Sequence, residues 1–264
     1  MRIMKLAQAA AMALSGAALL LLALAPLGTA LGWWHFGFGL YWMMPWSGYV
    51  AATSVALAVV TLALGWSKVC ARGRLVLAAA LVMGTVLAYV PWQYQRIRSA
   101  LPPIHDITTD TDAPPAFVAV LPARAAENAG SVVYDHAQLP GSQRKAYPDL
   151  APVMAAMPVA SAFEQALRVA KAMPGWTIVG VDADAGRIEA SQQSRWFRFT
   201  DDIVIRIAGT EAGSRIDMRS TSRQGQSDYG VNAARIRVYM AALRKRLGVG
   251  HSRSTPVTPT APVA

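Results

Sequence analysis

Asp201 and Asp202 are the adjacent carboxylates with the clearest potential for chemistry in this sequence. A carboxylate pair can exchange protons with a substrate or hold a divalent cation. The same two residues also suit a turn between strands, because aspartate is a preferred turn residue. The turn is the favoured interpretation. A metal-dependent hydrolase that uses Asp201 and Asp202 is kept as the alternative function.

Nucleophilic catalysis has weaker support. Ser220, Ser222 and Ser227 lie in a C-terminal region, residues 159–248, that contains no histidine and no cysteine. A serine hydroxyl needs an adjacent base to become a good nucleophile. Lys171 and Lys245 fall on helix surfaces by their spacing, so a serine–lysine arrangement is not indicated either. The sequence therefore predicts no catalytic residue and favours a protein that is not an enzyme.

Metal ligands are few and far apart. The chain has four histidines and one cysteine. His35 lies in an aromatic loop, His105 and His136 lie in separate polar segments, and Cys70 stands alone. A structural metal site needs several such ligands close together. We expect no metal site and no cofactor.

A set of polar residues surrounds a glycine-containing loop and the start of the last helix. Free N–H groups at a helix N-terminus favour an anion, and arginine binds phosphate or carboxylate through two bonds. The hypothetical anion site comprises Arg219, Ser222, Arg223, Ser227, Asp228, Asn232 and Arg235. In the structural alternative, Ser227 or Asp228 caps the helix and Arg223 or Arg235 pairs with Asp228.

The elements that position these residues lie between 159 and 248. Ser161 and Glu164 form a capping box before one helix, and strands are predicted over 176–181 and 187–199. Strict alternation over 203–207 and 215–220 indicates an antiparallel hairpin, and a second helix follows. The sequence predicts an α+β fold with two layers: a four-stranded antiparallel meander with both helices on one face.

Three apolar stretches, about 6–31, 49–66 and 75–91, precede this region. Each is long enough to cross a bilayer, which takes roughly 17 to 25 residues. None contains Asp, Glu, Lys or Arg, so the three transmembrane helices are predicted to anchor the protein in the lipid bilayer.

Basic residues predict the orientation of these spans. Arg2 and Lys5 precede the first span, and Lys68, Arg72 and Arg74 lie between the second and the third. The positive-inside rule places both segments in the cytoplasm. The first span is too long for a cleaved signal peptide. We expect a multi-pass protein of the inner membrane with a cytoplasmic N-terminus and a periplasmic C-terminal domain.

The predicted organisation has four parts. Residues 1–92 form the three-helix anchor, and 93–158 form an extended, proline-rich link and N-terminal extension, with a possible short strand at 117–120. Residues 159–248 form the compact α+β domain. Residues 249–264, rich in Ser, Thr and Pro, are predicted to be disordered.

Several runs of residues resemble one bacterial family as a set. They are 104–112 with 114–117, Tyr147-Pro148-Asp149, 186–190, Trp196-Phe197, Asp201-Asp202, 222–228 and 232–236. Together they are similar to the domain-of-unknown-function 1499 family, in its membrane-attached form. The resemblance covers about 104–243. It implies no activity and no ligand.

The sequence thus favours a non-catalytic binding or interaction module for an anionic envelope ligand or an envelope protein. The alternatives are the hydrolase and a purely structural accessory subunit. Nucleic acid is not an expected partner, because the basic strand residues Arg195 and Arg198 are predicted to lie outside the cytoplasm.

Overall fold

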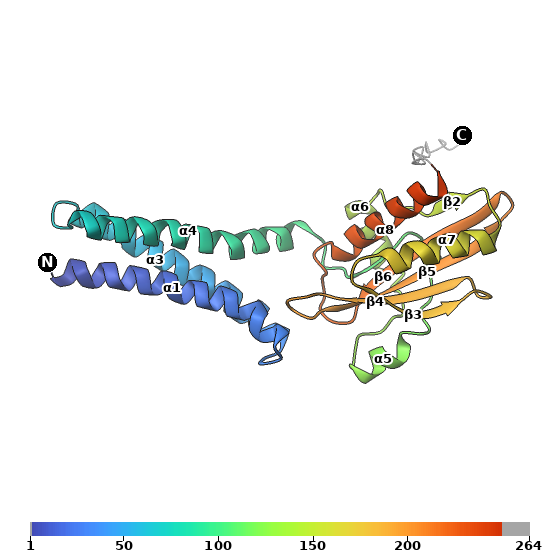
Figure 1. Ribbon diagram of the computed structural model, residues 1–264, viewed down its shortest axis with the longest axis horizontal. Coiled ribbons are helices and arrows are strands. Elements are labelled where there is room, and N and C mark those ends of the chain that lie inside the picture. The colour runs from blue at the N-terminus through green and yellow to red at the C-terminus, as the bar shows by residue number, and fades with distance from the viewer. Residues whose placement is uncertain (1, 250–264) are drawn as a thin grey trace, which may run out of the picture. The chain divides into compact units, whose positions relative to one another are not determined.

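The computed structural model describes residues 2–249 and consists of two units. A helical unit contains the first 103 residues together with 193–200, and a sheet domain contains Ile104–Gln192 and the residues from Asp201 onward. Figure 1 shows the order of the elements along the chain. Apart from its first residue, Val249, the tail predicted to be disordered lies outside the described residues.

The helical unit contains α1 (Arg2–Ala30), α2 (Phe36–Phe38), η1 (Gly39–Met43), α3 (Met44–Gly65) and α4 (Ala71–Ala100). Three helical segments are long and apolar enough to cross a membrane: 2–30, 36–65 and 71–100. They overlap the three predicted spans and begin before each of them, and the first two end one residue earlier than predicted, at Ala30 and Gly65. The prediction of three spans is confirmed, and the chain is a membrane protein.

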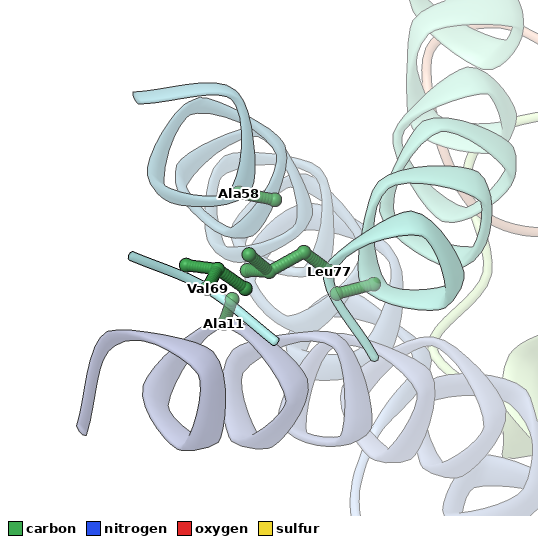
Figure 2. Close-up of a cluster of buried hydrophobic side chains, with 5 residues drawn as sticks. Ala11, Ala58, Val69 and Leu77 are labelled. Atoms are coloured by element: carbon green, nitrogen blue, oxygen red, sulfur yellow. The ribbon is translucent and has the colours of Figure 1, made fainter. Parts of the chain in front are cut away.

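Small side chains form the centre of this unit. Ala11, Ala58, Leu77 and Ala80 are fully buried and pack with Val69 (Figure 2). Apolar contact alone drives helices together only weakly in lipid, so small residues that permit close approach stabilise the packing.

Two serines add hydrogen bonds between the helices. The hydroxyls of Ser15 and Ser54 lie 2.8 Å apart, and Ser54 also donates to the carbonyl of Ala11 at 2.7 Å. Ser15 reaches the carbonyl of Ala80 at 3.2 Å. Both hydroxyls are therefore satisfied where lipid offers no partner.

The sheet domain is built on six strands: β1 (Asp106–Thr108), β2 (Val153–Ala155), β3 (Trp176–Asp182), β4 (Arg187–Gln193), β5 (Thr200–Thr210) and β6 (Gly213–Ser222). The strand order is β1-β6-β5-β4-β3, and β2 also pairs with β6. The α+β class is confirmed. The count of four strands is wrong, because β1 and β2 come from the segment predicted to be a link and extension.

Four local predictions also need correction. Thr200, Asp201 and Asp202 do not form the turn but begin β5, and β4 ends at Gln193 rather than Phe199. Residues 117–120 contain no strand, and α7 (Val159–Ala172) begins after Pro158, so Ser161 lies inside its first turn. Asp201 and Asp202 pair with Ser222 and Thr221 of β6, so strand pairing overrides their local preference for a turn.

One face of the sheet packs against α7 and α8 (Val231–Leu247), as Figure 1 shows. Alternate residues of β5 and β6 are fully or almost fully buried on this face: Ile203, Ile205, Ile207, Ile216 and Met218. Strand side chains alternate between faces, so these residues form one continuous apolar surface.

That surface meets the two helices. Tyr239 of α8 is fully buried, stacks on the ring of Trp176 at 5.4 Å and donates to the carbonyl of Ala166 at 3.0 Å. Burial raises the pKa of the Tyr239 hydroxyl far above its ordinary value. Both helices lie on one face, as predicted.

The opposite face is covered by an irregular segment with one short helix, α5 (Leu121–Ala126). Phe117, Val120 and Val204 form a buried apolar cluster there. Glu189, only 1% exposed, accepts the backbone N–H groups of residues 118, 119 and 120 at 2.9 to 3.1 Å. These bonds tie the segment to β4. The sheet is therefore covered on both faces, which the sequence did not predict.

Candidate functional site

The first polar group, the α8 cluster, lies between the start of β5 and α8. It comprises Asp201, Arg235, Gln192, Ser220, Asn232 and Ser222. Arg235 Nη2 lies 2.6 Å from a carboxylate oxygen of Asp201, and its Nε donates to Gln192 at 2.7 Å. Arg235 also donates to the Ser220 hydroxyl at 2.9 Å and to the Asn232 side-chain carbonyl. Every polar side chain in this cluster thus has a partner.

Asn232 extends the α8 cluster to β1. Its side-chain N–H groups donate to the backbone carbonyl of His105 at 2.8 Å and to the Ser222 hydroxyl at 3.1 Å. Ser220 in turn donates to the Asn232 side-chain carbonyl oxygen at 2.6 Å. Asn232 is fully buried and joins a helix, a strand and the N-terminal extension.

The second group, the α5 cluster, lies on the other face of the sheet and is centred on Asp202. Its members are Asp202, Arg124, Arg223, Ser191 and Glu127. Arg124 Nη1 donates to Asp202 at 2.8 Å, and Arg223 binds both carboxylate oxygens of Asp202 at 2.9 and 2.8 Å. Ser191 donates at 2.6 Å. The bond to Asp202 raises the pKa of Arg223, so this guanidinium is always charged.

Arg219 belongs to neither cluster and connects several segments of the domain. Its guanidinium forms two bonds with Asp106, at 2.8 and 2.6 Å, and donates to the carbonyls of Pro115 and Val132. The rings of Phe117 and Tyr134 lie 5.1 and 5.3 Å from its central carbon. Arg219 is 3% exposed and holds β1 and the irregular segment against β6.

The N-cap residue of α8 is Gly230 rather than Ser227 or Asp228, but the carboxylate of Asp228 still binds N–H groups at the start of the helix. This carboxylate accepts the backbone N–H groups of Gly230 at 3.0 Å and Asn232 at 2.5 Å. Burial raises the pKa of Asp228 and outweighs the opposing effect of these two bonds. Neither Arg223 nor Arg235 pairs with it, because both bind other carboxylates. Ser227 contributes to the turn, where its hydroxyl accepts the N–H of Tyr229 at 3.3 Å.

The predicted anion site is therefore divided by the sheet. Arg235, Asn232 and Ser222 lie on the α8 face, whereas Arg219 and Arg223 lie on the α5 face. All three arginines are paired with aspartates, which supports a structural role for them. Ligand binding by these residues stays a prediction.

The carboxylates of Asp201 and Asp202 also point to opposite faces, as adjacent strand residues must. One binds an arginine of α8, and the other binds arginines of α5 and of the loop after β6. The two groups do not converge on a common point. A single cation held by both, as the hydrolase alternative requires, has no support in this arrangement.

A polar pocket of about 320 Å³ lies elsewhere in the domain, beside β1 and α6 (Leu139–Ala146). Its lining includes Asp110, Asp112, Gln143, Arg144, Tyr147 and Arg215. Gln143 is buried and bonds both backbone groups of Thr108, at 3.0 and 2.6 Å. These bonds satisfy one outer position of the edge strand and fix α6 as a wall of the pocket.

Charges in the polar pocket differ in exposure. The side chain of Asp110 is 11% exposed and is bound by Arg206 at 3.0 Å and Arg215 at 2.8 Å. Burial alone would raise the pKa of Asp110, but backbone N–H groups and Arg215 outweigh it and lower the pKa. Arg144 and Asp112 pair at 2.5 Å with side chains 58% and 85% exposed. The ion pair at the rim is therefore accessible to solvent.

A family model described as a protein of unknown function, DUF1499, matches residues 106–243. The chain belongs to this family. Comparisons with curated proteins and with solved structures find no match. The matched range begins at β1 and ends within α8, so the DUF1499 domain is the sheet domain, and the spans precede it.

Sequence reasoning missed several polar partners in the DUF1499 domain. Asp106, Arg124, Glu127, Glu189 and Gln192 each bond a distant segment in the structure. Four of these five side chains bond groups about 70 to 115 positions away, and Gln192 bonds Arg235, 43 positions away, so no local pattern predicts them. The one available signal was Glu189, an acid between Ile188 and Ala190 of β4.

Proposed function

We propose that the DUF1499 domain is a non-catalytic binding or interaction module, anchored at a membrane, for an anionic ligand or a protein of the cell envelope. The observation that supports this function is the pairing of Asp201 and Asp202 with arginines on opposite faces of the sheet. Carboxylates that pair with arginines in this way stabilise the fold. Because the two carboxylates lie on opposite faces, they do not form one reaction centre.

The cost of displacing an internal partner favours the polar pocket as the place for a ligand. Asp202 is fully buried and binds both Arg223 and Arg124, so an anion that took Arg223 from it would break a buried ion pair and leave Arg124 as its remaining arginine, at a cost of up to about 3 to 5 kcal/mol. Asp112 is largely exposed, and an exposed ion pair contributes only about 0 to 1 kcal/mol. An incoming anion can therefore replace Asp112 at Arg144 at little cost.

Ligand binding is tested by melting the full chain in a neutral detergent with phosphate, phosphoglycerol or short acidic glycans. We expect at least one of these anions to raise the Tm of the wild-type domain, and Arg144→Gln to abolish the rise. Arg168→Gln is the matched control, because its side chain is 63% exposed and lies on α7, outside the pocket. An absence of any response in the wild type would contradict an anionic ligand.

The anion site that was predicted from the sequence is tested in the same experiment by the variants Arg223→Ala and Arg235→Ala. We expect both variants to melt lower at every anion concentration, because Arg235→Ala leaves Asp201 without its guanidinium and Arg223→Ala leaves buried Asp202 with Arg124 alone. If instead they kept their stability and lost an anion response that Arg144→Gln retained, the ligand would bind at those arginines.

We propose that the domain lies on the side of the membrane opposite to Lys68, Arg72 and Arg74, which is the periplasm in a cell with two membranes. A reporter that is active only in the periplasm should work when fused after Leu247 and fail when fused at Cys70. The reverse pattern would overturn this orientation.

A further inference from the structure

An open apolar groove of about 640 Å³ lies between α3 and α4 in the helical unit. Its lining includes Pro45, Gly48, Ala52, Ala88, Trp92 and Gln95. The groove sits near the end of α4 that bears Arg96 and Arg98, and its volume lies within the range of sites that hold small ligands, roughly 300 to 1,000 Å³.

Small residues on both helices create this groove. A methyl group on Gly48 would lie 3.2 Å from two ring atoms of Pro91, so the helices touch closely at that point. Ala52 and Ala88 leave space beside this contact. Tyr49 and Trp92 form the walls and are 67% and 54% exposed. These aromatic residues are of the type that lies at the level of lipid headgroups.

The groove has a basic end. The guanidinium of Arg96 lies 5.6 Å from the ring centre of Trp92, which lines the groove, and Arg98 follows two residues later. No acidic residue occurs before Asp106, so these arginines have no carboxylate partner within their own unit up to residue 103. They differ in this from Arg223 and Arg235, which are neutralised inside the sheet domain.

We propose that the groove binds one anionic phospholipid, with an acyl chain between α3 and α4 and the phosphate against Arg96. The apolar walls suit a hydrocarbon chain, and guanidinium groups bind phosphate strongly. A basic residue at a membrane surface favours an anionic lipid by about five-fold. This site does not depend on any ligand or partner of the sheet domain.

Native mass spectrometry of the full chain tests the proposal. The protein is mixed with phosphatidylglycerol and phosphatidylcholine of the same acyl chains and released from its detergent or nanodisc. We expect one phosphatidylglycerol to be retained about five-fold more often than phosphatidylcholine. Ala52→Phe fills the groove and should reduce retention of both lipids. Arg96→Gln should remove the preference and leave retention of phosphatidylcholine unchanged.

Matched variants separate this site from the general lipid shell. Ala63→Phe introduces the same side chain at another exposed position of α3, and Arg72→Gln removes a cation at the start of α4. Both should retain phosphatidylglycerol as the wild type does, and helical content should be unchanged in all four variants. Three outcomes would overturn the proposal. The wild type could retain the two lipids equally, or Ala52→Phe and Ala63→Phe could lose lipid equally. The third is a second copy of the chain bound in place of lipid.

Discussion

The centre of the helical unit and the centre of the sheet domain are built from different residues. The centre of the helical unit contains alanines and the paired hydroxyls of Ser15 and Ser54. The centre of the sheet domain contains larger side chains, Ile205, Met218 and Tyr239, together with buried ion pairs. In lipid, burying a larger apolar side chain gains little, so close approach of backbones stabilises the bundle. In water, the removal of apolar surface is the dominant favourable term.

This difference predicts that equal truncations have unequal effects in the two units. The sheet domain should lose stability when a large side chain or one member of a buried ion pair is removed. The helical unit should tolerate the loss of single groups, because each contributes less and lipid fills the space.

The largest effect is expected for Asp202→Ala. Arg124 and Arg223 would both lose their buried partner, and breaking a buried pair costs about 3 to 5 kcal/mol. Chemical denaturation of the sheet domain measures the change. The exposed pair gives the control, since Asp112→Ala should cost under about 0.5 kcal/mol. Similar losses in both variants would show that burial does not govern these pairs.

Ile205→Ala should cost about 2 to 5 kcal/mol, because Ile205 is fully buried and truncation leaves a cavity. Val179 on β3, 41% exposed, provides the comparison. Val179→Ala should change the free energy of unfolding by about 0.5 kcal/mol or less. A loss below that value for Ile205 would mean that the faces of β5 are reversed.

Ser15→Ala should have a smaller effect, about 0.6 kcal/mol and at most about 1.7, which is the range for hydrogen bonds between membrane helices. Unfolding of the full chain in mixed micelles measures it. Thr53 donates only within its own helix and is exposed, so Thr53→Ala is the control. A loss above about 2 kcal/mol for Ser15 would remove the contrast between the two centres.

The smallest effects are expected in the pH dependence of the Tm. The pKa of Asp149 is lowered chiefly by its bond to Arg237, and the pKa of Asp110 is lowered as described. A lowered folded pKa gives stability that is present above the unfolded value, about 3.9, and is lost as pH falls through the folded value. The Tm difference between pH 7 and pH 3 should therefore shrink in Asp110→Asn.

Asp228 should act in the opposite sense. Its raised pKa gives stability that is present below about pH 3.9 and is lost as pH rises through the folded value. Asp228→Asn should therefore enlarge the loss of Tm on acidification. A change of the same sign in Asp110→Asn and Asp228→Asn would contradict the assigned directions.

Much of the architecture is determined by local sequence patterns. Three long apolar runs specify the three helices, the alternation around Ile203 and Ile216 specifies the β5–β6 hairpin, and apolar spacing specifies α7 and α8. These patterns are sufficient because each element must bury one apolar face or cross one apolar layer. The family is also readable from short runs of residues.

Only the tertiary structure decided which charged groups meet. Arg124 reaches Asp202, 78 positions away, and Arg219 reaches Asp106, 113 positions away. The same long-range pairing draws 106–108 and 153–155 into the sheet and keeps Asp201 and Asp202 in a strand instead of a turn. An aspartate suits a turn or a buried ion pair equally well in the sequence, and the choice depends on an arginine that the fold brings across the sheet.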